Sequence, residues 1–247
     1  MIIFGLSDPG KVRELNEDAI LYSFFPTGEC AAVLADGLGG RSAGEIASDM
    51  ATRKFLDYIK DGLAQQYPDI YSLASHAINY ANYCVFKKAR SAPEFNGMCT
   101  TFVAVIVRGN EAAVISVGDS RCYWFADGKL QQITKDHSYV QDLIDRGELL
   151  AENALHHPKK NLITRALGVG CSVESDVYRL DLFEGDKILI CSDGLTNTVS
   201  DSEIAGILCS YDPREAVEQM ITCALRRSAP DNVSAVVIQF DGKEGKT

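Results

Sequence analysis

AAVLADGLGGRSAGEIAS, residues 31 to 48, joins a buried-strand pattern to an acidic turn and the start of a helix. The apolar run Ala31 to Ala35 is long enough for a buried strand, which is expected to end abruptly at Asp36, before the glycines. Ser42 can then cap a helix, with Glu45 three residues later. Taken alone, this is an ordinary Asp-Gly turn, but the chain repeats the pattern elsewhere.

The length and charge of the chain indicate how many domains it forms and which partners it lacks. Its 247 residues contain no linker, repeat or low-complexity stretch, which predicts one domain over residues 1–241 and a tail at 242–247. The 24 Lys and Arg residues against 34 Asp and Glu residues give 24 − 34 = −10, which provides no general attraction to nucleic acid or to an anionic membrane. We therefore expect neither nucleic acid nor membrane as a partner.

The N-terminus and the cysteines indicate the compartment. The first residues lack a basic segment, and no run reaches ~18 apolar residues, so neither a secretion signal nor a membrane-spanning helix is predicted. The eight cysteines are scattered without a CxxC pair, as expected for small core residues in a reducing compartment. Together these features predict a cytoplasmic protein.

Apolar runs and turns predict a β-rich chain with long helices. Residues 100–119 have the pattern of a hairpin of two buried strands. A third strand at 121–125 follows so closely that we expect all three in one antiparallel sheet. Helices are expected over about 42–58 and 70–89, and the weak periodicity between about 145 and 167 predicts a surface flap.

Four carboxylates recur at the ends of apolar strands: Asp36, Asp119 and Asp193 follow such runs, and Asp231 precedes one. If these strands are neighbours in packed sheets, their ends meet at one rim, where crowded carboxylates repel one another and lose hydration. Oxygen ligands without His or Cys favour Mg²⁺ or Mn²⁺. Two such ions can share a bridging carboxylate and an activated water, a site suited to phosphate esters, and Arg13 could clamp the phosphate.

The simpler alternative is that these aspartates only form hairpin turns. Asp127-Gly128 and Gly185-Asp186 fit that interpretation. Asp36 and Asp193 fit it less well, because each leads into a glycine-containing loop or a helix rather than into a returning strand. From spacing alone, both a two-metal phosphohydrolase and a set of turns remain open.

A series of motifs in order along the chain resembles the metal-dependent Ser/Thr protein phosphatases of type 2C (the PPM family), in their compact bacterial form. The fold implied by the resemblance is α+β, a four-layer α/β/β/α sandwich of two antiparallel sheets flanked by helices, with a metal centre at one rim. The matching motifs are SDPGKVRELNED (7–18), LADGLGGRSAGEIAS (34–48), TTFVAVIV (100–107), SVGDSRCYWF (116–125), TKDHSYVQDLIDRGEL (134–149), ITRALG (163–168), ICSDGLTNTVSDSEI (190–204) and PDNVSAVVI (230–238).

The resemblance also implies metal ligands at matching positions. Asp36 would bridge two ions, and the backbone carbonyl of Gly37 would be a ligand of the first. Asp193 and Asp231 would be ligands of the second ion. Asp119, with Asp193, would form a third and weaker site.

Further roles follow from the same comparison of motifs. Glu17 and Asp18 would hold metal-bound waters, and Arg13 would bind the phosphate. Many eukaryotic relatives have a proposed general acid, His, where this chain has Leu38, so we assign no side-chain general acid. Ser234 replaces the more common Thr of the last motif, which is a mild change.

The resulting expectation is a protein phosphatase that hydrolyses phosphoserine and phosphothreonine by direct attack of a metal-bridging hydroxide, with two Mg²⁺ or Mn²⁺ ions and a possible third. Its partners would be phosphoproteins, with a bacterial Ser/Thr kinase as counterpart, and the chain would be a monomer. The alternatives are a catalytically silent regulatory module, disfavoured because the metal carboxylates are present, and another metal hydrolase such as a nuclease, disfavoured by the acidic charge.

Overall fold

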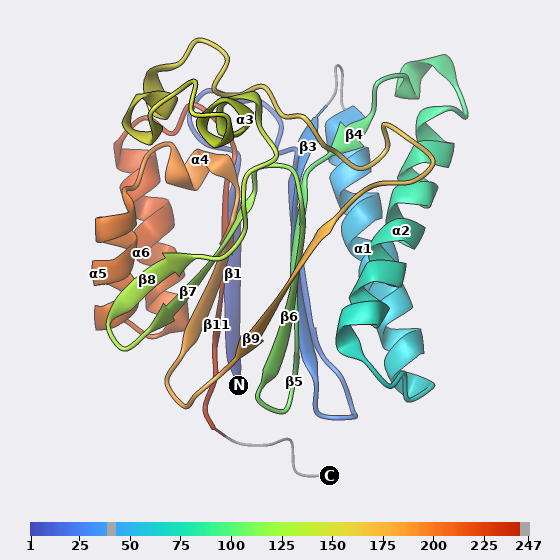
Figure 1. The fold of residues 1–247 in the computed structure, drawn as a ribbon, viewed down its shortest axis with the longest axis vertical. Helices are drawn as coiled ribbons and strands as arrows, with labels where there is room; N and C mark the ends of the chain where they lie inside the picture. Colours follow the sequence, from blue (N-terminus) through green and yellow to red (C-terminus); the bar gives the residue numbers. More distant parts are fainter. Residues whose placement is uncertain (39–42, 243–247) are drawn as a thin grey trace.

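Two antiparallel β-sheets pack face to face between two layers of helices (Figure 1). The computed structural model describes residues 1–38 and 43–242, without the side chains of residues 155 and 156. The expected helix cap at Ser42 and nearly all of the expected tail lie outside the described residues. The expected four-layer α+β sandwich is confirmed.

The first sheet has the order β1-β11-β10-β7-β8, so the first and last long strands of the chain are neighbours. Its strands are β1 (Ile2–Asp8), β11 (Val233–Gln239), β10 (Lys187–Cys191), β7 (Arg121–Ala126) and β8 (Lys129–Gln132).

The second sheet has the order β2-β3-β5-β6-β9, and a short strand extends β3 at the rim. Its strands are β2 (Asp18–Phe24), β3 (Cys30–Leu38), β5 (Phe102–Arg108), β6 (Glu111–Val117) and β9 (Asp176–Asp181), with β4 (Cys99–Thr100) paired to β3.

Helices cover the outer face of each sheet. The helices α1 (Ala43–Ala64) and α2 (Ile70–Ala89) pack on the second sheet, and α5 (Asp201–Ser210) and α6 (Pro213–Arg226) pack on the first (Figure 1). The remaining helical elements are α3 (Tyr139–Asp145), α4 (Asp193–Thr196), η1 (Pro93–Phe95) and η2 (Ala151–His156).

Strand β3 explains why the central apolar run is uninterrupted. Ala31 and Val33 face the helices α1 and α2, whereas Ala32 and Leu34 face the other sheet. Because both faces of the strand are buried, every position from 31 to 35 is apolar instead of every second one.

Three details differ from the expectations. Strand β7 does not join β5 and β6 but crosses to the first sheet, where it pairs with β10, because the residues between β6 and β7 turn away at Gly118 (φ 104°). Strand β3 does not end at Asp36 but continues to Leu38, because Gly37 and Leu38 pair with β4.

The third difference concerns the start of α5. The sequence DSEIAGIL (201–208) predicts a helix that Asp201 caps, but Ser200 is the cap, in a reciprocal capping box with Glu203. Asp201 is the first helical residue and accepts a hydrogen bond of 3.2 Å from the Tyr123 hydroxyl. Its carboxylate therefore links α5 to β7 instead of closing the helix end.

Candidate metal centre

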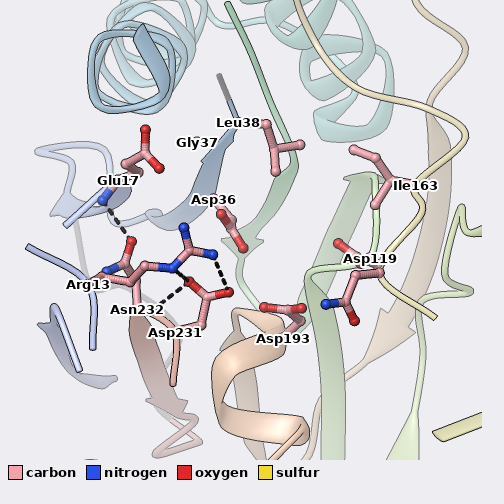
Figure 2. A pocket seen from close by; sticks show the side chains of 11 residues that line it. Arg13, Glu17, Asp36, Gly37, Leu38, Asp119, Ile163, Asp193, Asp231 and Asn232 are labelled. Atoms are coloured by element: carbon pink, nitrogen blue, oxygen red, sulfur yellow. Dashed lines mark hydrogen bonds and ion pairs between the residues drawn. The ribbon is translucent and has the colours of Figure 1, made fainter. Parts of the chain in front are cut away.

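A cavity of about 220 Å³ opens at one rim of the sandwich, where strands of both sheets end (Figure 2). Four aspartates from four separate segments face it, together with an arginine, as Figure 2 shows. The lining residues are Arg13, Glu17, Asp36, Gly37, Leu38, Asp119, Asn161, Ile163, Asp193, Asp231 and Asn232.

Strand β3 holds Asp36 from within the sheet rather than from a loose turn. The Asp36 N–H donates to the Thr101 hydroxyl at 2.9 Å, and the Asp36 carbonyl accepts from the Thr101 N–H at 2.9 Å and from the Thr100 hydroxyl at 2.8 Å. These hydrogen bonds fix both the N–H and the carbonyl of Asp36, and its side chain projects toward Asp193 and Asp231 (Figure 2).

Gly37 permits a close contact between β3 and the start of α1. A Cβ atom at this position would collide with the carbonyl of Gly44. Gly44 in turn lies against the carboxylate of Glu17, which accepts a hydrogen bond from the backbone there. The glycine after Asp36 thus brings a helix start and a second acid to the rim.

The first sheet contributes the other side of the cavity. Asp193 is the first residue of α4, two residues after the end of β10, and its Oδ2 accepts from Asn197 Nδ2 at 3.0 Å. Asp231 lies just before β11, and Asp119 lies in the turn between β6 and β7. Strand ends from both sheets therefore supply the acids.

Asn232 ties the loop of residues 9–17 to the start of β11. Its side-chain amide donates to the carbonyls of Pro9 and Leu15 at 3.0 and 2.9 Å, and its Oδ1 accepts from the Glu17 N–H at 2.8 Å. This loop carries Arg13, which forms a two-point ion pair with Asp231, each contact at 3.0 Å (Figure 2). The arginine side chain is half exposed.

Burial and neighbouring charges raise the pKa values of three aspartates at this rim. Burial, followed by the charges of Asp193 and Asp136, raises the pKa of Asp119 to about 7. Burial, followed by the charges of Asp18 and Asp193, raises the pKa of Asp36 well above its usual range. The pKa of Asp193 is raised by the same two causes, burial and the charge of Asp231.

Asp18 lies behind Asp36, to which it is paired across β2 and β3, and it does not line the cavity. Its Oδ2 accepts from the hydroxyls of Ser192 at 2.8 Å and Ser234 at 2.6 Å, whereas its buried Oδ1 has no hydrogen-bond partner among the described residues. Burial raises the pKa of Asp18 to about 7. An unpartnered buried carboxylate oxygen fits an outer ligand for water on a metal ion.

The donor set also fits hard divalent cations. Among the described residues, no three His, Cys, Asp or Glu side chains converge on one ion position. Ions at this rim would thus be held by pairs of carboxylates, the Gly37 carbonyl and water. Mg²⁺ and Mn²⁺ suit such sites, since they prefer oxygen ligands and Mg²⁺ retains several waters.

All the residues expected at the site meet at this rim, with Asp18 behind the cavity wall. The sequence patterns assigned no role at the site to Asn161, Ile163, Asn232 or the two serines on Asp18. Asn232 directly follows Asp231, and Ser192 directly precedes Asp193, so adjacency to the predicted acids was the available signal. None of the described residues lining the cavity is histidine, and Leu38 lies in the wall.

The other sequence expectations have mixed outcomes. Cys30, Cys122 and Cys191 are buried as expected, but Cys171 and Cys209 are exposed, because the latter two lie in a loop and on the outer face of α5. No described helix is both long enough and apolar enough to cross a membrane.

Comparisons with known proteins agree with the fold and identify the family. The sequence profile described as Protein phosphatase 2C matches residues 11–237. The serine/threonine protein phosphatase PstP of Mycobacterium tuberculosis is 38% identical over 233 residues, which are 94% of this chain and 43% of that protein, so the chain spans less than half of the length of this relative. The serine/threonine phosphatase stp of Listeria monocytogenes is 36% identical over 237 residues, 95% of this chain and 94% of that protein.

A solved structure extends the likeness to three dimensions. The crystal structure of the PstP catalytic domain in complex with two manganese ions superposes with a TM-score of 0.84 at 36% identity, covering 96% of each chain. The match of the profile over most of the chain, together with these relatives, shows that the chain belongs to the protein phosphatase 2C family.

Proposed function

We propose that this chain is a metal-dependent phosphatase that removes phosphate from phosphoserine and phosphothreonine in proteins. The observation that carries the proposal is the meeting of Asp36, Asp119, Asp193 and Asp231, from the strand ends of both sheets, in one cavity with Arg13. Family membership agrees with this activity. The relatives PstP and stp bear the names of serine/threonine phosphatases.

Two Mg²⁺ or Mn²⁺ ions would bind between the sheets. Asp36 would bridge them, the Gly37 carbonyl would be a ligand of one, and Asp193 and Asp231 would be ligands of the other. Asp119 would hold a third ion together with Asp193. When bound, these ions supply water of lowered pKa and neutralise charge on the phosphoryl oxygens.

Glu17 and Asp18 would orient water around the ions. Asp18 is suited to this because Ser192 and Ser234 occupy one of its oxygens and leave the other buried and free to accept. Burial raises the pKa of Glu17, so bound cations would favour its charged form. Both acids therefore act on the ions indirectly, through the water that they hold.

Arg13 would bind the phosphate of the substrate. Its guanidinium has the planar donor pattern that matches two phosphoryl oxygens, and its half-exposed side chain can turn from Asp231 toward the cavity. There it would stabilise the charge that develops during in-line displacement. No side chain is assigned as the acid for the leaving hydroxyl, since Leu38 occupies the matching position.

The finer expectations belong to the same proposal. Residues 1–241 would form the single catalytic domain, with the flap at about 145–167 selecting which phosphoproteins fit. The physiological counterpart would be a bacterial Ser/Thr kinase and its substrates, and the chain would act as a cytoplasmic monomer.

Phosphate release from a phosphothreonine peptide tests this function. We expect release that requires Mn²⁺ or Mg²⁺, stops with a chelator, and falls by at least about 100-fold in Asp193→Asn. Absence of metal-dependent release from phosphoserine and phosphothreonine peptides would contradict the proposal and favour a silent regulatory module. Release from nucleotides alone would instead favour a different metal hydrolase.

A further inference from the structure

A smaller cavity of about 60 Å³ adjoins the metal centre beneath the flap. The two cavities share Asp119, Asn161 and Asp193, so their walls meet at the two carboxylates assigned to the third ion. Lys160, an exposed flap residue, lines the smaller cavity. A positive side chain of the flap thus faces the same space as two acids of the rim.

The other cation of this smaller cavity is already bound. Arg121 holds Asp136 through three contacts of 2.7 to 3.2 Å and also donates to the Tyr123 hydroxyl at 3.1 Å. In contrast, no described carboxylate lies within ion-pair distance of the Lys160 ammonium. Its charge lowers the pKa of Asp193, against the larger effect of burial. Of the two cations that line this cavity, Lys160 is therefore the one whose charge is available to Asp119 and Asp193.

We propose that the positive charge of the Lys160 ammonium, carried by the flap, acts on Asp119 and Asp193 and opposes the binding of a divalent cation between these two carboxylates. This inference rests on the proposed function, because it takes both aspartates as metal ligands. A flap that carries Lys160 toward the wall would disfavour the third ion, and a flap that moves away would favour it. Flap position and metal occupancy would then be coupled.

The size of the effect follows from the charges. An ammonium several ångströms from a doubly charged ion, in the partly hydrated environment of a cavity, weakens binding of that ion roughly three- to tenfold. Because the cavity is open to solvent, added salt would reduce the effect. The ion held by Asp36 and the Gly37 carbonyl would be less affected, since neither residue lines the smaller cavity.

Lys159 offers a matched control. It is the neighbouring flap residue, it is exposed and it carries the same charge, but its ammonium lies 4.9 Å from the centre of the Tyr139 ring. It does not line the smaller cavity. Replacing Lys159 changes the net charge of the protein as much as replacing Lys160 does, so the two variants separate a local effect from a general one.

The test is a titration of the metal-free protein with Mn²⁺, followed by calorimetry and by the loss of the spectroscopic signal of free Mn²⁺. For the weakest site, we expect Lys160→Gln to lower the Kd roughly three- to tenfold, Lys160→Arg to resemble the wild type, and Lys159→Gln to change nothing. In the double variant Lys160→Gln with Asp119→Asn, the gain should disappear.

Several results would overturn the inference. These are equal effects of Lys159→Gln and Lys160→Gln, no change in Mn²⁺ binding in Lys160→Gln, or a gain that persists in the double variant. If Lys160→Gln only raised KM for a phosphopeptide, the residue would be a substrate contact instead. A wild-type protein that binds no Mn²⁺ would contradict the proposed function itself, whereas wild-type binding that is unaffected by Lys160→Gln contradicts only this inference.

Discussion

The two ends of the sandwich both carry aspartates next to strands, but the chain treats them in opposite ways. At the end with the hairpin turns, Asp186 accepts hydrogen bonds from the Trp124 indole at 3.1 Å and from the Phe183 N–H at 2.9 Å. At the same end, Glu29 is paired with Arg108 at 3.0 Å. Both of these acids have a donor supplied by the chain, although Oε2 of Glu29 is buried without a hydrogen-bond partner among the described residues.

At the opposite rim, the acids outnumber the donors. The charges of neighbouring aspartates raise the pKa values of Asp36, Asp119 and Asp193, and Arg13 lies against Asp231. The comparison shows that an aspartate at a strand end is structural where the fold supplies its partner. Where the fold brings acids together with few donors, their repulsion is relieved by protonation, as the raised pKa values of Asp36 and Asp119 indicate, or, under the proposed function, by bound cations.

The largest expected effect is that of Asp36→Asn. Because Asp36 is assigned as the bridging ligand, Mn²⁺-dependent phosphate release should fall by at least about 100-fold. The same substitution removes a like charge from the crowded rim, so the metal-free protein should melt at a higher temperature than the wild type. Activity assays and thermal melts in chelator measure both effects. A lower melting temperature together with retained activity would show that Asp36, like Asp186, is a structural acid rather than a metal ligand.

The pH dependence of stability should differ with and without metal. Burial raises the pKa values of Asp18 and Asp119 from 3.8 to about 7. Their contribution to the free energy of unfolding is therefore fully present below about pH 4 and is lost as the pH rises through about 7.

Bound Mn²⁺ requires the deprotonated carboxylates, so the increase in melting temperature caused by Mn²⁺ should be larger at pH 7.5 than at pH 5.5. Thermal melts across this range, with and without Mn²⁺, measure the difference. Asp119→Asn should flatten the metal-free profile, and an unchanged profile in that variant would contradict the assignment of the titration to this rim.

Ser234→Ala should have an intermediate effect. It removes a hydroxyl that donates to Asp18 at 2.6 Å, and loss of such a supporting hydrogen bond typically weakens metal affinity by about tenfold. Mn²⁺ titration measures the change. Ser210→Ala, on the exposed side of α5, is the control and should bind Mn²⁺ like the wild type; equal affinities for all three proteins would show that the serine only fills space.

Asp186→Ala should have the smallest effect on function. It leaves the Trp124 indole and the Phe183 N–H without their acceptor, which costs about 1–2 kcal/mol of the free energy of unfolding. Phosphatase activity should not change, because Asp186 lies at the end far from the cavity. Chemical denaturation and an activity assay measure the two effects. A fall in activity of the folded protein would contradict a purely structural role for Asp186.

The sequence was sufficient to predict the fold class and the acids, for reasons that are visible in particular residues. The apolar run at 31–35 and the helix at 70–89 carry local patterns, and the strand-end positions of Asp36 and Asp193 mark them as candidates. The fold class and the roles of these acids followed from the motif resemblance. The crossing of β7 to the other sheet could not be predicted from residues 116–125. After a tight turn that follows β6, the next strand can pair within the same sheet or join the other one. Sheet choice is decided by contacts between distant segments.

The supporting residues of the site were harder to predict for the same reason. Ser234 lies more than two hundred residues from Asp18 in sequence but donates to its carboxylate. Lys160 lies in a segment with weak periodicity, where no local pattern places a side chain. Such partners become visible only when the three-dimensional arrangement is known.

Diffraction from crystals of this protein grown with Mn²⁺, with anomalous scattering recorded at the manganese absorption edge, tests the central claim most directly. We expect anomalous peaks between Asp36, Asp193 and Asp231 in the wild type, and none there in Asp36→Asn. Crystals that contain Mn²⁺ elsewhere while this rim remains without a peak would contradict the claim that divalent cations hold these carboxylates together.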